Sequence, residues 1–211
     1  MELVDIIHQS STTNETWEKL HQNQSDLTEL MVIPAGSDYD FPHPSRWGPA
    51  LGDAKIAELG PNVGKNTRLK ELALYSNWDD EFVPSMLHRR RLAPSPLSDE
   101  EIERKRHNFK LLCEGFQKNK SIEKLHLQGT MIQYLMQFLT PFLMEHTNVL
   151  KEISLVECQL GNEDIQLFTH SLLTRGIPLE KLHLVVIQDG IEELVMAFHD
   201  NPGLFPKKFH A

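Results

Sequence analysis

The sequence predicts an α/β fold, a solenoid or horseshoe with a curved parallel sheet on its inner side and helices on its outer side. Two observations support this prediction. Leucines recur along the chain in an LxxLxL pattern at a nearly constant spacing, and this alternation is the period of a short strand with one buried face. Between these patterns, apolar residues spaced by three and then four positions mark one stripe of an amphipathic helix. Repetition of such a unit indicates an array whose neighbours share one core.

The strands are predicted from a repeated word. The pentapeptide Glu-Lys-Leu-His-Leu occurs at 123–127 and again at 180–184, and a related copy lies midway between them, so the period is 28 to 29 residues. Two earlier copies follow the same rule. The five predicted strands, each given by its aligned apolar residues, are Leu27/Leu30/Val32, Leu69/Leu72/Leu74, Ile122/Leu125/Leu127, Leu150/Ile153/Leu155 and Leu179/Leu182/Leu184.

A helix is predicted after each strand. In four cases the last residue of a helical triad precedes the first leucine of the next strand by six or seven residues, a regularity that chance does not readily produce. A fifth triad follows the last strand. The five triads are Ile56/Leu59/Val63, Phe109/Leu112/Phe116, Met136/Leu139/Leu143, Ile165/Phe168/Leu172 and Ile191/Leu194/Phe198.

The best single copy, LKEISLVECQL at 150–160, fits LxxLxLxx(N/C)xL at every position, with Cys158 in the Asn/Cys place. Asn77 fills the same place after an earlier strand. In this pattern and period the chain resembles the leucine-rich repeat family, and within it the ribonuclease-inhibitor-like class, over roughly residues 27–200. Three copies carry another residue in the Asn/Cys place: Ala35, Thr130 and Ile187.

The array is predicted to span 27–200, between a helical lead-in at 1–26 and an irregular tail at 201–211. In the tail, Pro206 and the sequence KKFHA do not continue the leucine alternation, so no sixth strand is predicted. No polar capping unit is recognisable, although arrays of this kind normally need one at each end. The chain is therefore either irregular at its C-terminus or a shortened member of a longer array. In the lead-in, Trp17 and Leu20 are expected to pack under the first strand.

Two inserts, at about 37–52 and about 78–103, lengthen the path from a strand to the next helix. Both fall on the same rim of the predicted solenoid, where such arrays often meet a partner. A loop that covers a helix end explains the first insert equally well. Ser98 with Glu101 forms a capping box for the helix that follows. Ser95 and Ser98 are candidate phosphorylation sites, but such short patterns are common by chance.

Composition and charge argue against several classes of protein. The formal charge of −9 argues against nucleic acid as a partner, because that binding depends on lysine and arginine displacing counterions. The N-terminus lacks a signal-peptide pattern, and no apolar run has the length of a membrane span. We therefore expect an intracellular, cytoplasmic protein that does not enter a membrane. Cys113 and Cys158 suit neither a disulfide framework nor a zinc site, and Cys158 is expected to be a buried, reduced core residue.

No enzyme, cofactor or metal site is predicted. GPNVGK at 60–65 resembles a phosphate-binding loop, but it has one residue too few between its glycines and no Ser or Thr after its lysine. It also lies between a helix and a strand, the reverse of the order that phosphate binding needs. Among eleven histidines, His126 and His183 share one repeat position. Two strand spacings of about 4.8 Å separate them, which is too far for one zinc ion.

The residues that alternate with the strand leucines point out of the predicted concave side. Charges just before the central leucine alternate in sign across strands, which predicts a ladder contributing a few tenths of a kcal/mol per pair. Further along, aromatic and aliphatic residues form an apolar strip. Such a mixture is suited to docking another protein, although solvent alone also accounts for it. We call the predicted partner-binding set the outward face: Glu71, Tyr75, Lys124, His126, Gln128, Glu152, Ser154, Val156, Lys181, His183 and Val185.

Together, the fold-level resemblance and the lack of a catalytic constellation predict a non-enzymatic protein–protein interaction module that uses the outward face and the rim inserts. The alternative is a regulator in trans of an enzyme. Some relatives of the resembled repeat class activate small GTPases and others present substrates to ubiquitin ligases, although no matching motif is recognisable in this chain. The sequence names neither the partner nor the pathway nor the oligomeric state.

Overall fold

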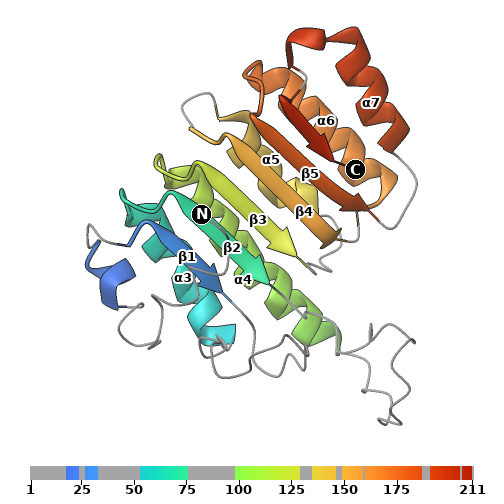
Figure 1. Cartoon of the computed structure of the whole chain (residues 1–211). Coiled ribbons are helices and arrows are strands. Elements are labelled where there is room, and N and C mark those ends of the chain that lie inside the picture. Colours follow the sequence, from blue (N-terminus) through green and yellow to red (C-terminus); the bar gives the residue numbers. More distant parts are fainter. Residues whose placement is uncertain are drawn as a thin grey trace, which may run out of the picture.

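A computed structural model describes residues 18–23, 27–32, 53–75, 98–128, 135–145, 149–158, 160–186, 191–204 and 206–210 of the chain. These residues form one sheet of six parallel strands whose spatial order follows the chain from β1 to β6 (Figure 1). Helices alternate with the strands along the chain. The predicted α/β fold with an all-parallel sheet is thus confirmed.

The strands are 3 to 7 residues long, and the helices α3 to α7 are 10 to 20 residues long. The strands are β1 Glu29–Val32, β2 Glu71–Tyr75, β3 Lys124–Gln128, β4 Glu152–Cys158, β5 Lys181–Val186 and β6 Lys208–His210. The helices are α3 Asp53–Lys65, α4 Asp99–Lys118, α5 Leu135–Met144, α6 Asn162–Arg175 and α7 Ile191–Asp200, followed by the 3₁₀ turn η2 Pro202–Leu204.

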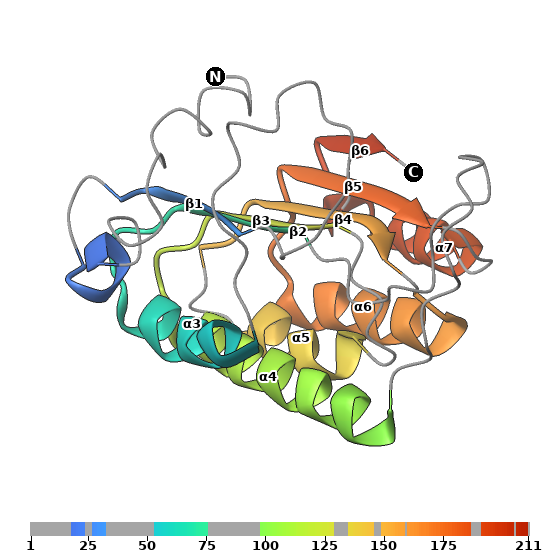
Figure 2. The ribbon, with the colours of Figure 1, turned by 90° about the horizontal axis from the view of Figure 1, so that it is seen from below.

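The core lies between the sheet and the helices. Figure 2 shows α3 to α6 together on one face of the sheet. All strand leucines and isoleucines and all helical triad residues whose side chains are described are at most 8% exposed, and they form one continuous cluster. Because full burial of such a side chain contributes roughly 1.5–3 kcal/mol, this shared cluster is the main source of stability. Each strand–helix unit therefore depends on its neighbours for a closed core.

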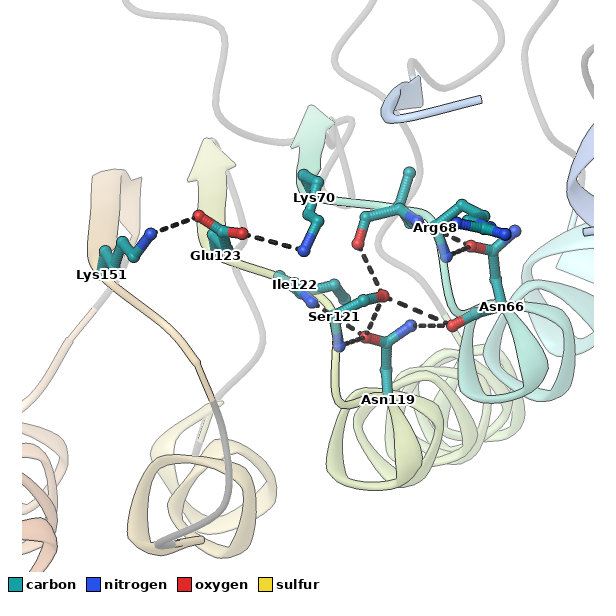
Figure 3. A network of polar contacts seen from close by, with 9 residues as sticks. Asn66, Arg68, Lys70, Asn119, Ser121, Ile122, Glu123 and Lys151 are labelled. Atoms are coloured by element: carbon teal, nitrogen blue, oxygen red, sulfur yellow. Dashed lines mark hydrogen bonds and ion pairs between the residues drawn. The ribbon is translucent and has the colours of Figure 1, made fainter. Parts of the chain in front are cut away.

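Buried asparagines hold two of the turns that lead from a helix into the next strand. The Asn119 side chain accepts the N–H groups of Ser121 (2.7 Å) and Ile122 (2.9 Å), and donates to the carbonyls of Val63 and Asn66, both at 2.7 Å. This network ties one unit to the unit before it (Figure 3).

One unit earlier the turn is built in the same way. Asn66 Oδ1 accepts the N–H groups of Arg68 (2.8 Å) and Leu69 (2.7 Å). The Ser121 hydroxyl then donates to the Leu69 carbonyl at 2.8 Å. Buried backbone groups that the loops would otherwise leave unpaired are satisfied by these side chains.

The turn after α6 uses different residues for the same task. Gly176 adopts a left-handed conformation with φ 66°, which favours glycine because it has no Cβ. The preceding residue, Arg175, is buried, and its Nη2 donates to the Leu150 carbonyl. Leu150 occupies the same repeat position as Leu69. Arg175 therefore takes the role that the Ser121 hydroxyl has two repeats earlier.

Glycines let α3 and α4 approach closely. A Cβ atom added to Gly60 would lie closer than 3.0 Å to backbone atoms of Leu111 and Leu112, and one added to Gly115 would meet the backbone of Gly60 equally closely. The sequence GPNVGK lies in the last turns of α3, and its first glycine serves this helix contact. The rejection of a phosphate-binding loop there agrees with this packing role.

Two predicted boundaries are wrong. Residues 99–103, assigned to the second insert, belong to α4, which begins directly after Ser98. The tail is not irregular, because it holds η2 and the sixth strand β6, with Phe209 in register with Leu182. An aromatic residue fills the place of a strand leucine, and its ring packs edge-to-face on Phe198 with centroids 6.2 Å apart.

Other expectations fall outside the described residues. These are the insert at 37–52, residues 78–97 of the second insert, Trp17 and Asn77. In the lead-in, residues 18–21 are helical and Leu20 is buried in the core, as predicted.

Replacing Gly115 with alanine should destabilise the protein by roughly 3 kcal/mol or more, because the new methyl group meets backbone that cannot move aside. Urea-induced unfolding followed by circular dichroism measures this loss. Gly203→Ala is the matched control, because nothing lies within 4 Å of the point that its new Cβ would occupy. Equal stability of the two variants would contradict close α3–α4 packing.

Replacing Asn119 with alanine should lower the free energy of unfolding by about 2–4 kcal/mol, because buried backbone groups on both sides lose their partners. Ser121→Ala should cost about 1 kcal/mol, since it removes a smaller part of the network. Gln166→Ala, on the exposed side of α6, controls for loss of a polar side chain. If Asn119→Ala lowered the free energy of unfolding by no more than Gln166→Ala, the proposed role of the turn would be contradicted.

Candidate functional site

Strand pairing arranges the outward face into three rows. In the first row, Cα pairing joins Glu71 to Lys124, Lys124 to Glu152 and Glu152 to Lys181. The second row is Ala73, His126, Ser154 and His183, and the third is Tyr75, Gln128, Val156 and Val185. The eleven residues predicted from the sequence thus lie side by side on β2 to β5.

The outward face is half-exposed where the opposite face of the sheet is buried. Lys124 and Val185 are exposed, and the other members whose side chains are described are intermediate. The side chain of Tyr75 lies outside the described part. The face therefore exposes charged, polar and aliphatic groups while the leucine core anchors its strands.

The predicted charge ladder is present in part. Lys124 Nζ lies 3.2 Å from Glu71 Oε2, and this contact raises the pKa of Lys124, with Glu152 and Glu29 adding to the effect. Within the described part, Glu71–Lys124 is the one pair of first-row neighbours whose charged nitrogen and oxygen atoms lie within 4.0 Å of each other. Exposed ion pairs of this kind contribute little to the stability of the fold. The charges of the first row therefore matter mainly as features of the protein surface.

A second ladder, which was not predicted from the sequence, precedes the first row. Glu123 bridges two strands, with Oε1 2.9 Å from Lys70 Nζ and Oε2 2.6 Å from Lys151 Nζ (Figure 3). Hydrogen bonds from Lys151 and then Lys70 lower the pKa of Glu123. The signal was present in the sequence, because the residue before each first-row residue also alternates in sign.

The histidines of the second row lie in different surroundings. His183 Nδ1 lies 3.2 Å from the Ser154 hydroxyl on the neighbouring strand. Burial lowers the pKa of His126, against a hydrogen bond with Gln128 that raises it. With β4 between them, His126 and His183 do not converge on one point. The described residues contain no group of three or more potential metal ligands.

Both cysteines are buried and free. Cys158 is 1% exposed, and its Sγ lies 3.6 Å from the carbonyl oxygens of Leu127 and Val156. The prediction of a buried, reduced core residue is confirmed. Burial raises the pKa of the Cys113 thiol, which disfavours the thiolate form that a reactive cysteine needs.

Comparison with known proteins identifies a shared fold. No protein-family model matches the chain, and no curated protein matches it. It is similar to the solved structure of the actin-binding site 2 of leiomodin-1, with a TM-score of 0.59 and 16% identity over 90% of this chain and 86% of that chain. It also aligns with the tropomodulin C-terminal domain of Caenorhabditis elegans, with a TM-score of 0.49 and 12% identity over 91% and 90%.

The leiomodin-1 likeness shows a common arrangement of strands and helices over most of both chains. Within the described part, no helix is long and apolar enough to cross a membrane.

The lowered pKa of His126 predicts a pH dependence of stability. Its unfolded value is near 6.5, so the unfolded state binds more protons than the folded state as pH falls below 6.5, and folding weakens. Urea unfolding at pH 7.5 and pH 5.5 should show a smaller loss of stability in His126→Gln than in the unchanged protein. His170→Gln, an exposed position on α6, controls for loss of a histidine, and a loss in His126→Gln as large as in the unchanged protein would contradict the assignment.

Proposed function

We propose that this chain is an intracellular, non-enzymatic protein-interaction module of the leucine-rich repeat type, with a ribonuclease-inhibitor-like solenoid. The outward face is its docking surface. The observation that carries the proposal is the register of β2 to β5, which gathers the mixed rows of charged, polar and aliphatic side chains on one side of the sheet.

The repeat assignment rests on period and packing together. In each copy of the leucine pattern the second and third apolar residues lie in a strand, and each triad lies in a helix, with the described members in the same core. The order of the strands follows the chain without a crossover, as expected for stacked units that contact only their neighbours.

The chemistry of the outward face favours a protein partner. Non-obligate interfaces combine apolar and polar area in about the proportions of ordinary surface. Val156 and Val185 form an aliphatic strip beside Gln128. Lys124 offers a cation between two carboxylates, and Lys181 offers a cation beside Glu152. A partner with apolar residues and carboxylates at matching spacing would satisfy both parts.

Actin is the partner to test first, because the structure that shares this fold at a TM-score of 0.59 is an actin-binding site. The regulator-in-trans hypothesis stays a prediction from the sequence, since nothing in the described residues bears on GTPase activation or on ubiquitin ligases.

Reversing the charge of Lys124 and Lys181 together, as Lys124→Glu with Lys181→Glu, should weaken partner binding at least about tenfold, because truncation or reversal of a central charge costs roughly 1.4 kcal/mol or more. The measurements are co-sedimentation with filamentous actin and quantitative affinity purification from lysate.

The matched control is Lys110→Glu with Lys118→Glu, which makes the same change in net charge on the exposed side of α4. Thermal melts of both variants establish that the fold is intact. Retention of every partner by the Lys124/Lys181 variant would move recognition from the outward face to the rim inserts.

A further inference from the structure

The strands of this sheet are joined by one repeated backbone contact at their N-terminal ends. The carbonyl of the residue before each strand accepts N–H groups from the start of the next strand, at 2.7–3.2 Å. The accepting carbonyls, in chain order, belong to Thr28, Lys70, Glu123, Lys151 and Glu180.

This series leaves complementary groups at the two ends of the sheet. The next acceptor in the series is the Lys207 carbonyl, before β6, and in the described part it accepts no hydrogen bond. At the other end, the N–H groups of Thr28 and Glu29 are the donors that an earlier unit would have paired. Figure 2 shows β1 and β6 at opposite ends of the sheet.

Charge follows the same division. Within the sheet, first-row neighbours from Glu71 to Lys181 are of opposite sign, but Glu29 at one end pairs with Glu71, and Lys208 at the other pairs with Lys181. Neither Glu29 nor Lys208 has an ion pair in the described part. Each end therefore carries an unbalanced charge, negative at β1 and positive at β6.

The helix layer is also open at the β6 end. On α5, the residue that follows the middle of the triad is Thr140, and it faces the next helix, because its hydroxyl lies 3.3 Å from that of Ser171 on α6. The equivalent residues Cys113 and Thr169 are 3% and 6% exposed. On α7 the equivalent residue, Val195, is 43% exposed.

Lysines on an edge strand often serve to block pairing with other strands. That role accounts for Lys207 and Lys208, but it does not account for the exposed Val195, for the 62% exposure of its neighbour Met196, or for the opposite charge at β1. A selective docking end accounts for all four features.

We propose that a second copy of this chain docks head-to-tail on this end, so that its β1 adds to β6 as a seventh parallel strand. Thr28 and Glu29 of the second copy would donate to the Lys207 carbonyl, and the Glu29 carboxylate would face Lys208. The helical turn at 18–21 would cover Val195.

Residues 18–32 repeat the helix-to-strand step of the later units. The helical turn at 18–21 precedes β1, and Leu20 stands seven residues before Leu27, the separation found between Leu172 and Leu179. Because the two surfaces differ, a docked pair still presents one unused surface of each kind, so association is expected to continue beyond a dimer. The outward face stays free, so this association does not depend on the proposed function.

Sedimentation velocity of the full chain at increasing concentration tests this proposal. The unchanged protein should show a weight-average sedimentation coefficient that rises steadily with concentration at low ionic strength and less so in high salt, which screens the Glu29–Lys208 pair. Glu29→Lys and Lys208→Glu should each remain monomeric, since either change brings like charges together. The double variant Glu29→Lys with Lys208→Glu should recover association, because it restores opposite charges.

Both single variants should fold, because each turns a like-charged pair within the sheet, Glu29–Glu71 or Lys181–Lys208, into a pair of opposite charges. Thermal melts check that they fold. Lys110→Glu, an equal charge change on α4, should associate like the unchanged protein. A monomer at all concentrations, association of Lys208→Glu at the unchanged level, a closed dimer without larger species, or a double variant that stays monomeric would overturn the proposal. So would a monomeric protein whose partner binding is lost in Lys208→Glu, since the end would then serve another protein.

Discussion

Each strand–helix unit of this chain buries its leucines against the next unit, and the register between neighbouring strands fixes the position of every other strand residue. A slip of one residue would move a row of leucines to the solvent side. Two sets of contacts oppose such a slip: the repeated backbone hydrogen bonds between consecutive strand starts, and the turns held by Asn66 and Asn119. The asparagine turns pair buried backbone groups, so their loss would cost more than the loss of an exposed ion pair.

The outward face is a consequence of this register. None of its residues needs a special backbone conformation, because alternation along a strand sends every second side chain outward. The charge ladders add little energy, yet they alternate across strands so that no like charges meet between β2 and β5. That regularity is interrupted at both ends, where Glu29 meets Glu71 and Lys208 meets Lys181, which is why the ends differ in chemistry from the middle.

Much of this arrangement could be predicted from the sequence, and the misses have physical causes. The leucine period located the first five strands and their helices, because burial of one strand face and one helix stripe imposes a pattern on apolar residues. It missed β6, where Phe209 replaces leucine. It also missed Asn119 and Gly115, whose roles depend on backbone groups far apart in the sequence, and no periodicity reports such contacts. The outward positions followed from alternation, whereas the partial burial of His126 depends on neighbouring residues that are far away in the sequence.

The open end of the array and its outward face make different demands on a partner. Docking on the outward face needs a surface that fits side chains, so its specificity depends on which residues stand between the leucines. Docking on β6 needs a partner with a free strand, and main-chain hydrogen bonds to such a strand can form with many different sequences. Specificity at that end must then come from Lys207, Lys208 and the exposed Val195, which penalise a strand that brings no carboxylate or no apolar cover. The charged first-row residue of each strand thus has two roles in this fold. Within the sheet its charge is opposite to that of its neighbours, and at the two ends of the sheet its charge determines which strand can be added.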